Sequence, residues 1–171
     1  MTDAAFSPPL PPGGQAWIPR RAARVLLLDG ADRVLMFHGF DPARPTHLFW
    51  FTPGGGLDAG EPWALGAARE LAEETGLRLE PGQLGAPVWR DVTEYSFDGR
   101  WYRQEQEFFL VRVPTWEVDT AGFDEVERDT VDGHRWWTIE EFDVTDERFY
   151  PLELPSLLRQ LQNCSPTLGR E

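Results

Sequence analysis

The segment from Gly55 to Leu77, GGLDAGEPWALGAARELAEETGL, decides how this chain of 171 residues is expected to fold. Between Glu61 and Thr75 the apolar residues recur at helical spacing, and Gly76 follows them as a typical C-cap. The glycines of Pro53-Gly54-Gly55-Gly56 permit backbone conformations that are closed to other residues. The segment therefore predicts a glycine-rich loop that leads from a strand into an amphipathic helix.

One face of this helix carries carboxylates. Glu70, Glu73 and Glu74 fall within an arc of about 100°, and like charges at these spacings repel one another by a few tenths of a kcal/mol per pair. A bound cation would relieve this repulsion, and oxygen ligands without His or Cys favour Mg²⁺ or Mn²⁺ over zinc. The opposite face is apolar and is expected to pack against the rest of the protein; it comprises Ala64, Ala68, Leu71, Ala72 and Thr75.

Short apolar runs bounded by turn residues surround this segment and predict strands. Two of them flank Asp29-Gly30-Ala31-Asp32 and two flank Asp98-Gly99, so each pair predicts a β-hairpin. Thr138 and Glu141 form a capping-box pattern that predicts the start of a short helix. The expected strands are residues 24–28, 34–37, 48–52, 88–97, 101–113 and 134–137, and a last helix is expected over residues 155–162.

The first 20 residues are rich in proline and glycine, which favours extended backbone over packed structure. We therefore expect a flexible tail at residues 1–20, one domain at residues 21–162 and a C-terminal tail at residues 163–171. Cys164 is the single cysteine and is expected to be a bystander thiol in that second tail.

The chain is strongly acidic, with a net charge of −13 and a pI near 4.6. Proteins that grip duplex nucleic acid need clustered Lys and Arg, so no duplex partner is expected. No stretch approaches the ~18 apolar residues of a membrane span, so no membrane partner is expected and a cytoplasmic location is the default. A small polyanion can still bind to an acidic protein where a divalent metal neutralises the repulsion locally.

The spacing in the opening segment is Gly, five residues, Glu, seven residues, then Arg-Glu-aliphatic-any-Glu-Glu-any-Gly-aliphatic. This spacing resembles, in full, the Nudix box of the MutT-like superfamily of Nudix hydrolases. A chance match at one starting position has a probability on the order of one in a billion. The resemblance implies an α/β protein with the Nudix fold, which is an α/β/α sandwich with a mixed central sheet.

The resemblance also implies a set of metal ligands. Glu70, Glu73 and Glu74 are expected to bind Mg²⁺, with Mn²⁺ as a substitute, together with the backbone carbonyl of Gly55. Glu70 and Glu73 are the expected catalytic residues. Glu70 is the first choice for the general base, although the family varies in whether the base lies in the box helix or in a distal loop.

Two other box residues are implied to have a structural role. Glu61 and Arg69 are expected to form an ion pair that anchors the glycine-rich loop to the helix. Gly66, one turn before the carboxylates, costs roughly 1 kcal/mol relative to alanine within a helix. We expect its missing side chain to leave room for phosphate.

The implied activity is hydrolysis of the phosphoanhydride in a nucleoside diphosphate linked to another moiety. A nucleoside triphosphate, a dinucleoside polyphosphate and a nucleotide sugar all meet this description, so the expected partner is a small nucleotide-derived substrate. Tyr95 lies about where diadenosine polyphosphate hydrolases carry a tyrosine. A homodimer is a candidate assembly, because members of the family often dimerise.

Residues outside the box are further candidates for the site. One additional metal ligand or the general base is expected among Glu105, Glu107, Glu125 and Glu127. Arginines near the second hairpin are candidates to bind substrate phosphate, with Arg103 preferred over Arg90 and Arg100. The aromatic candidates to stack on a nucleobase are Trp89, Trp101 and Tyr102.

Two other functions compete with a small-molecule hydrolase. A non-catalytic Nudix-fold sensor would bind nucleotides without cleaving them, but such proteins generally lose box carboxylates, and this chain retains all of them. A decapping-type hydrolase of RNA 5′ ends would use the same chemistry but needs a basic channel for the chain, which the charge of −13 disfavours.

Overall fold

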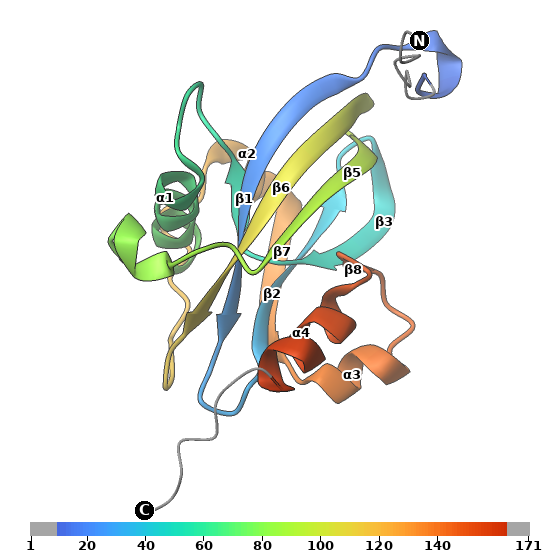
Figure 1. The fold of residues 1–171 in the computed structure, drawn as a ribbon. Coiled ribbons are helices and arrows are strands. Elements are labelled where there is room, and N and C mark those ends of the chain that lie inside the picture. The colour runs from blue at the N-terminus through green and yellow to red at the C-terminus, as the bar shows by residue number, and fades with distance from the viewer. Residues whose placement is uncertain (1–9, 164–171) are drawn as a thin grey trace, which may run out of the picture.

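The computed structural model describes residues 10–163, in which helices lie on both faces of one curled sheet (Figure 1). The strands are β1 (Ile18–Leu28), β2 (Val34–Asp41), β3 (Arg44–Phe51), β4 (Gly54–Gly56), β5 (Trp89–Phe97), β6 (Arg100–Arg112), β7 (Val131–Trp137) and β8 (Phe149–Tyr150). The helices are α1 (Trp63–Thr75), α2 (Glu125–Thr130), α3 (Ile139–Val144) and α4 (Leu154–Asn163), with short 3-10 turns at Pro12–Gly14 and Pro81–Leu84.

The sheet is mixed, as expected. Its strand order is β5-β6-β1-β2-β3-β8, with β4 paired to β1 and β7 paired to β2. The pairs β1–β6 and β3–β8 are parallel, whereas the other pairs are antiparallel. β1 and β2 meet at Leu28 and Val34, and further along β1 the partner on that side is the short strand β4.

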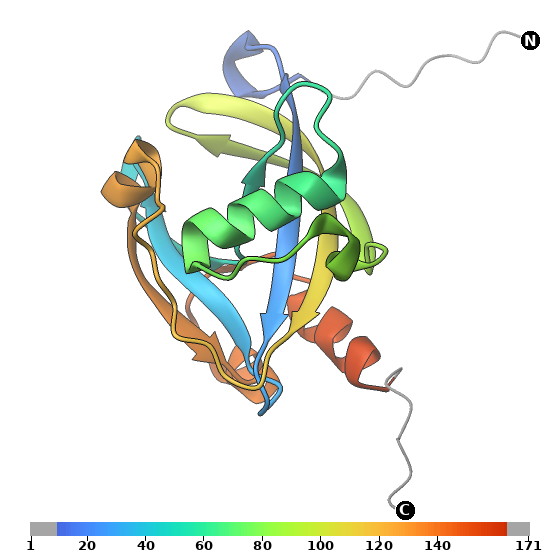
Figure 2. The same cartoon turned by 90° about the vertical axis from the view of Figure 1, so that its left-hand side faces the viewer.

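A separate hydrophobic core covers each face of the sheet. β1 supplies both cores because successive side chains of a strand point to opposite faces. Val25 and Leu27 pack with Leu71 of α1, while Leu26 packs with Leu158 of α4. Figure 2 shows α1 lying across β1 on one face, with α4 behind the sheet. This arrangement confirms the expected α/β/α sandwich.

Several strand and helix boundaries differ from the expected ones; β3, for example, begins at Arg44 and not at Leu48, and β8 was not expected. β1 begins at Ile18, inside the segment expected to be a tail, because the 13-residue β6 offers it a parallel partner from Tyr102 onwards. Gly54–Gly56 pairs with β1 as β4 although glycine is a poor strand former. The acidic segment before β7 contains α2, which Asp124 starts with a capping box.

The tips of two hairpins are joined through one buried carboxylate. Asp41, at the end of β2, is 1% exposed and accepts hydrogen bonds from the N–H groups of Ala43 and Asp98 at 3.0 and 2.9 Å. Arg44 Nε donates to the same carboxylate at 2.8 Å, and Arg44 Nη2 reaches Ser96 Oγ at 3.1 Å. The β5–β6 hairpin is thereby attached to the β2–β3 hairpin, which keeps the sheet curled.

Replacing Asp41 with asparagine tests this attachment. The amide retains an acceptor for Asp98 but presents a donor to Arg44, so we expect the free energy of unfolding at pH 7 to fall by about 1 to 3 kcal/mol. Chemical denaturation measures the change, and the exposed Asp146→Asn is the matched control. An equal loss in both variants would show that Asp41 does not join the hairpins.

The effect of Asp41→Asn should also depend on pH. Burial alone would raise the pKa of Asp41, but hydrogen bonds from Asp98 and Arg44 outweigh burial and hold it below its ordinary value. The stabilisation is therefore complete above an unfolded-state pKa of about 3.9 and is lost as pH falls through the lower folded-state pKa. We expect the difference in stability between wild type and variant to shrink in acid.

Candidate metal centre

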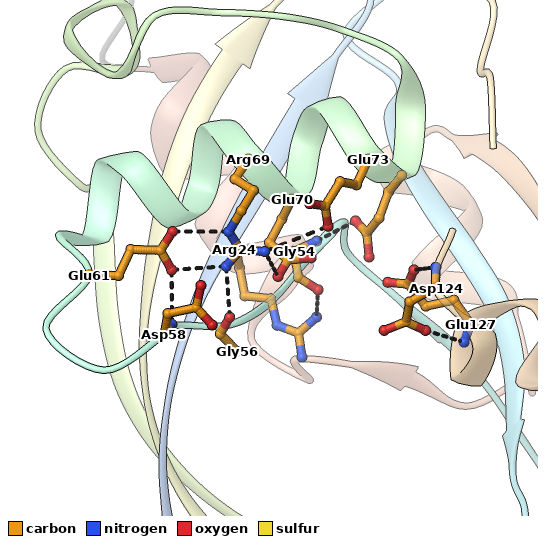
Figure 3. A network of polar contacts seen from close by, with 11 residues as sticks. Arg24, Gly54, Gly56, Asp58, Glu61, Arg69, Glu70, Glu73, Asp124 and Glu127 are labelled. Atoms are coloured by element: carbon orange, nitrogen blue, oxygen red, sulfur yellow. Dashed lines mark hydrogen bonds and ion pairs between the residues drawn. The ribbon is translucent and has the colours of Figure 1, made fainter. Parts of the chain in front are cut away.

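Three carboxylates converge where α1 passes α2 and β4 (Figure 3). Glu70 and Glu74, one turn apart on α1, are 7% and 2% exposed. Each of them and Glu127 of α2 offers an oxygen, and these oxygens lie within 4.8 Å of one another. Among the described residues this cluster is the one whose geometry suits a metal ion.

Each carboxylate of the cluster is held by a neighbouring donor. The N–H of Gly54 donates to Glu74 Oε2 at 2.6 Å, and Arg69 Nη1 donates to Glu70 Oε1 at 2.7 Å. Glu127 Oε2 receives the N–H of Asp124 at 2.8 Å in the capping box of α2, and a side-chain hydrogen bond joins Glu127 to Glu74. The donors orient the carboxylates without neutralising their combined charge.

The environment of the cluster disfavours its negative charge. Burial raises the pKa of Glu70, and burial together with the Glu70 charge raises the pKa of Glu74 well above its ordinary value. Burial also raises the pKa of Glu127. A divalent cation bound among these oxygens would reverse this preference, and an all-oxygen donor set suits Mg²⁺ or Mn²⁺.

Glu73 lies differently from the other two glutamates of α1. Its side chain is 46% exposed and its Oε2 is 3.6 Å from Arg69 Nη1. Its charge still contributes to raising the pKa of both Glu70 and Glu127, so it lies at the edge of the cluster. The shared acidic face expected from sequence is therefore divided into two buried carboxylates and one exposed carboxylate.

An arginine connects the glycine-rich loop to the helix. Arg69 Nε and Nη2 donate to the two oxygens of Glu61, both at 2.9 Å, and Nη2 also donates to the carbonyl of Gly56 at 3.0 Å. Glu61 in turn accepts the N–H of Asp58 at 2.9 Å. Hydrogen bonding to Arg69 lowers the pKa of Glu61, and the same bonds raise the pKa of Arg69.

Two glycines of the segment are explained by close contacts. A Cβ on Gly55 would lie 2.7 Å from the carboxylate of Glu70, so a side chain there would displace that carboxylate. A Cβ on Gly66 would lie 2.0 Å from Leu57 Cδ2 and 3.1 Å from Glu61 Oε2. The expectation that Gly66 leaves room for phosphate was wrong, because the loop itself occupies that space.

The candidate residues on β5 and β6 have partners on neighbouring strands. Glu107 pairs with Arg90 at 2.9 Å and lines a shallow hollow together with Trp63 and Asp91. Arg103 lies 3.3 Å from Glu94. These contacts give no support to a role of Glu107 in the carboxylate cluster, whereas Glu127, which lies between the expected strands 101–113 and 134–137, belongs to it.

The other candidates are distributed over the molecule. Glu105, Glu125, Arg90 and Arg100 are exposed. The aromatic candidates contact other rings: Trp89 packs on Phe108, Trp101 on Trp17, and Tyr102 stacks on Tyr95. The hydroxyl of Tyr95 accepts from Arg20 Nη1 and donates to Gln104 Oε1, so this tyrosine is already engaged within the sheet.

Sequence reasoning missed two residues that contact the cluster or its loop. Gly54 holds Glu74, and Arg24 Nη1 donates to the carbonyl of Gly54 at 2.7 Å. A signal for Arg24 was present, since it is the charged residue that opens an apolar strand run, RVLLL. Its partner was not predictable, because the contact spans 30 residues of sequence.

Comparison with known proteins agrees with this architecture. A model of the NUDIX domain matches residues 18–157, which is most of the chain. The chain therefore belongs to the NUDIX family. None of the helices within residues 10–163 has the length and apolar character needed to cross a membrane.

Two similar proteins of the family are named RNA pyrophosphohydrolase. An RNA pyrophosphohydrolase of Afipia carboxidovorans is 30% identical over 156 residues, which cover 87% of this chain and 77% of that protein. One of Dinoroseobacter shibae is 33% identical over 101 residues, covering 54% of this chain and 61%, less than two thirds, of that relative.

Solved structures share the fold at low sequence identity. A MutT protein from Methanosarcina mazei has a TM-score of 0.63 at 15% identity, covering 86% of this chain and 95% of that one. An Ap4A hydrolase from C. elegans has a TM-score of 0.53 at 19% identity, covering 84% and 96%.

Replacing Arg69 with methionine tests how the loop is anchored. The change leaves Glu61 and the carbonyl of Gly56 without their donor, so we expect the free energy of unfolding to fall by about 2 to 3 kcal/mol. Thermal and chemical denaturation measure the loss, and Arg78→Met on the exposed surface is the matched control. A variant as stable as the control would mean that Arg69 does not anchor the loop.

Proposed function

We propose that this protein is a Mg²⁺-dependent pyrophosphohydrolase that cleaves the phosphoanhydride of a nucleoside diphosphate linked to another moiety. The convergence of Glu70, Glu74 and Glu127 carries the proposal. Burial raises the pKa of Glu70 and of Glu74, so keeping both charged beside Glu127 is costly, and a bound cation would offset that cost.

The proposal assigns metal binding, proton transfer and loop anchoring to different residues. Glu70, Glu74 and Glu127 hold the cation, with the carbonyl of Gly55 and the exposed Glu73 as further ligands. When bound, Mg²⁺ neutralises phosphate charge and lowers the pKa of a bound water. Glu70 is the proposed general base, since burial raises its pKa while the hydrogen bond from Arg69 favours the ionised form that can accept a proton. Glu61 and Arg69 keep the loop in place.

The substrate class has two candidates. A small nucleotide, such as a nucleoside triphosphate, a dinucleoside polyphosphate or a nucleotide sugar, suits the net charge of −13. The RNA 5′ end is favoured by the names of the relatives from A. carboxidovorans and D. shibae. Both contain the same diphosphate at the reacting centre, so the carboxylate cluster suits either. A cytoplasmic location and a homodimer remain predictions.

A substrate panel with Mg²⁺ separates these candidates. We expect product release from nucleoside triphosphates, diadenosine polyphosphates, nucleotide sugars or a 5′-triphosphate RNA oligonucleotide, with the best substrate defining the class.

Glu74→Gln should reduce turnover by about a hundredfold or more, because a ligand charge is lost. The same change should leave the metal-free protein at least as stable, because it removes like-charge repulsion. Binding without cleavage, with Mg²⁺ or Mn²⁺, would instead indicate a sensor.

Glu127 can be tested against a neighbour on the same helix. Glu127→Gln should weaken Mn²⁺ binding and hydrolysis by at least about tenfold. Glu125→Gln alters an exposed carboxylate of α2 outside the cluster and should change both by less than about twofold. Equal effects of the two substitutions would show that Glu127 of α2 does not bind the metal.

A further inference from the structure

The guanidinium of Arg24 is partly buried beside the candidate metal centre. Its Nη1 donates to the carbonyl of Gly54 at 2.7 Å (Figure 3). The same atom lies 3.4 Å from the carbonyl oxygen of Thr52. Burial, with the nearby charge of Arg20, lowers the pKa of Arg24. A strand that otherwise supplies apolar side chains to two cores thus places a cation against the backbone of the glycine-rich loop.

The backbone of Gly54 is bonded on both of its sides. Its carbonyl accepts from Arg24, and its N–H donates to Glu74 Oε2 at 2.6 Å. The residue has φ +126°, and a Cβ there would lie 2.1 Å from the carbonyl oxygen of Ala23. Only glycine fits this place, and the two hydrogen bonds add to the pairing of β4 with β1 in setting its orientation.

Besides the Gly54 amide, Glu74 shares a side-chain hydrogen bond with Glu127. It is 2% exposed and its neighbours Glu70 and Glu127 repel it, while the Gly54 N–H and the charge of Arg24 act in the opposite direction. Without Arg24, the Gly54 carbonyl would lose its side-chain donor, and the pairing of β4 with β1 would be left to hold the peptide whose N–H orients Glu74. The peptide bonded by Arg24 also leads directly into Gly55, whose carbonyl is a proposed ligand.

We propose that Arg24 is a positioning residue of the metal centre, which acts through the Gly54 backbone to set the orientation of Glu74. This inference rests on the proposed function for its consequence in metal binding. The link between Arg24 and Gly54 can, however, be measured without any metal.

The first experiment measures hydrogen exchange at the Gly54 amide by NMR in the metal-free protein. Arg24→Met should accelerate exchange there by about tenfold or more, because the carbonyl loses its donor and the amide its fixed acceptor. Arg21→Met is the matched control, since Arg21 lies on the same strand and its guanidinium is 4.3 Å from the ring centre of Trp63. Unchanged protection of Gly54 in Arg24→Met would overturn the proposal.

The second experiment measures Mn²⁺ affinity by electron paramagnetic resonance without substrate. Arg24→Met should weaken binding by about ten- to hundredfold, the usual effect of losing a residue that orients a ligand. Arg24→Lys retains the charge and one donor and should recover part of the affinity, whereas Arg21→Met should match wild type. The lysine variant also tests the proposal if the methionine variant does not fold.

The outcomes separate this inference from the proposed function. Wild-type protein that binds Mn²⁺ and hydrolyses substrate, while Arg24→Met binds Mn²⁺ equally well, would overturn the positioning role alone. A raised KM with unchanged Mn²⁺ affinity would also overturn it, because Arg24 would then contact substrate. Wild-type protein that binds neither Mg²⁺ nor Mn²⁺ would overturn the proposed function, while the exchange experiment would still decide whether Arg24 holds Gly54.

Discussion

The repulsion between buried carboxylates is the constraint on which the rest of this structure depends. Glu70 and Glu74 lie one turn apart on α1, both nearly inaccessible to water, and Glu127 faces them from α2. Charges taken out of water are costly unless they are paired or bound to a metal. Arg69, Arg24 and the Gly54 N–H surround the cluster and supply part of the compensation.

The fold supplies these partners from elements that are far apart in the sequence. β1 crosses beneath α1 and carries Arg24, while the short strand β4 fits between them because its glycines permit close approach. Arg69 joins the loop to the helix through Glu61, so the loop and α1 act as one rigid element. Glu127 comes from a six-residue helix whose own capping box orients the side chain.

The net charge of the whole chain and the charges at the candidate site have different consequences for function. A charge of −13 argues against an extended basic channel, yet it says little about a single reacting diphosphate. The relatives named RNA pyrophosphohydrolase keep the RNA 5′ end among the candidate substrates. Arg24 on β1 interacts with the charges of Glu70 and Glu74, so charges of both signs lie at this site.

Much of the fold and the central part of the candidate site were predictable from local patterns. The box helix, both hairpins and the capping box at Thr138 follow from periodicity and turn residues, which act over a few neighbours in the chain. The spacing of Glu61, Arg69 and the α1 glutamates likewise identified the family. These features were accessible because each interaction lies within a short stretch of sequence.

The tertiary structure alone decided which carboxylates meet. It turned Glu70 and Glu74 inward and left Glu73 exposed, brought in Glu127 from a segment without a strong pattern, and paired Glu107 with Arg90 instead. It also placed Arg24 on Gly54, across 30 residues. Sequence periodicity specifies which face of an element is polar, whereas the neighbours of that face depend on how distant strands and helices pack.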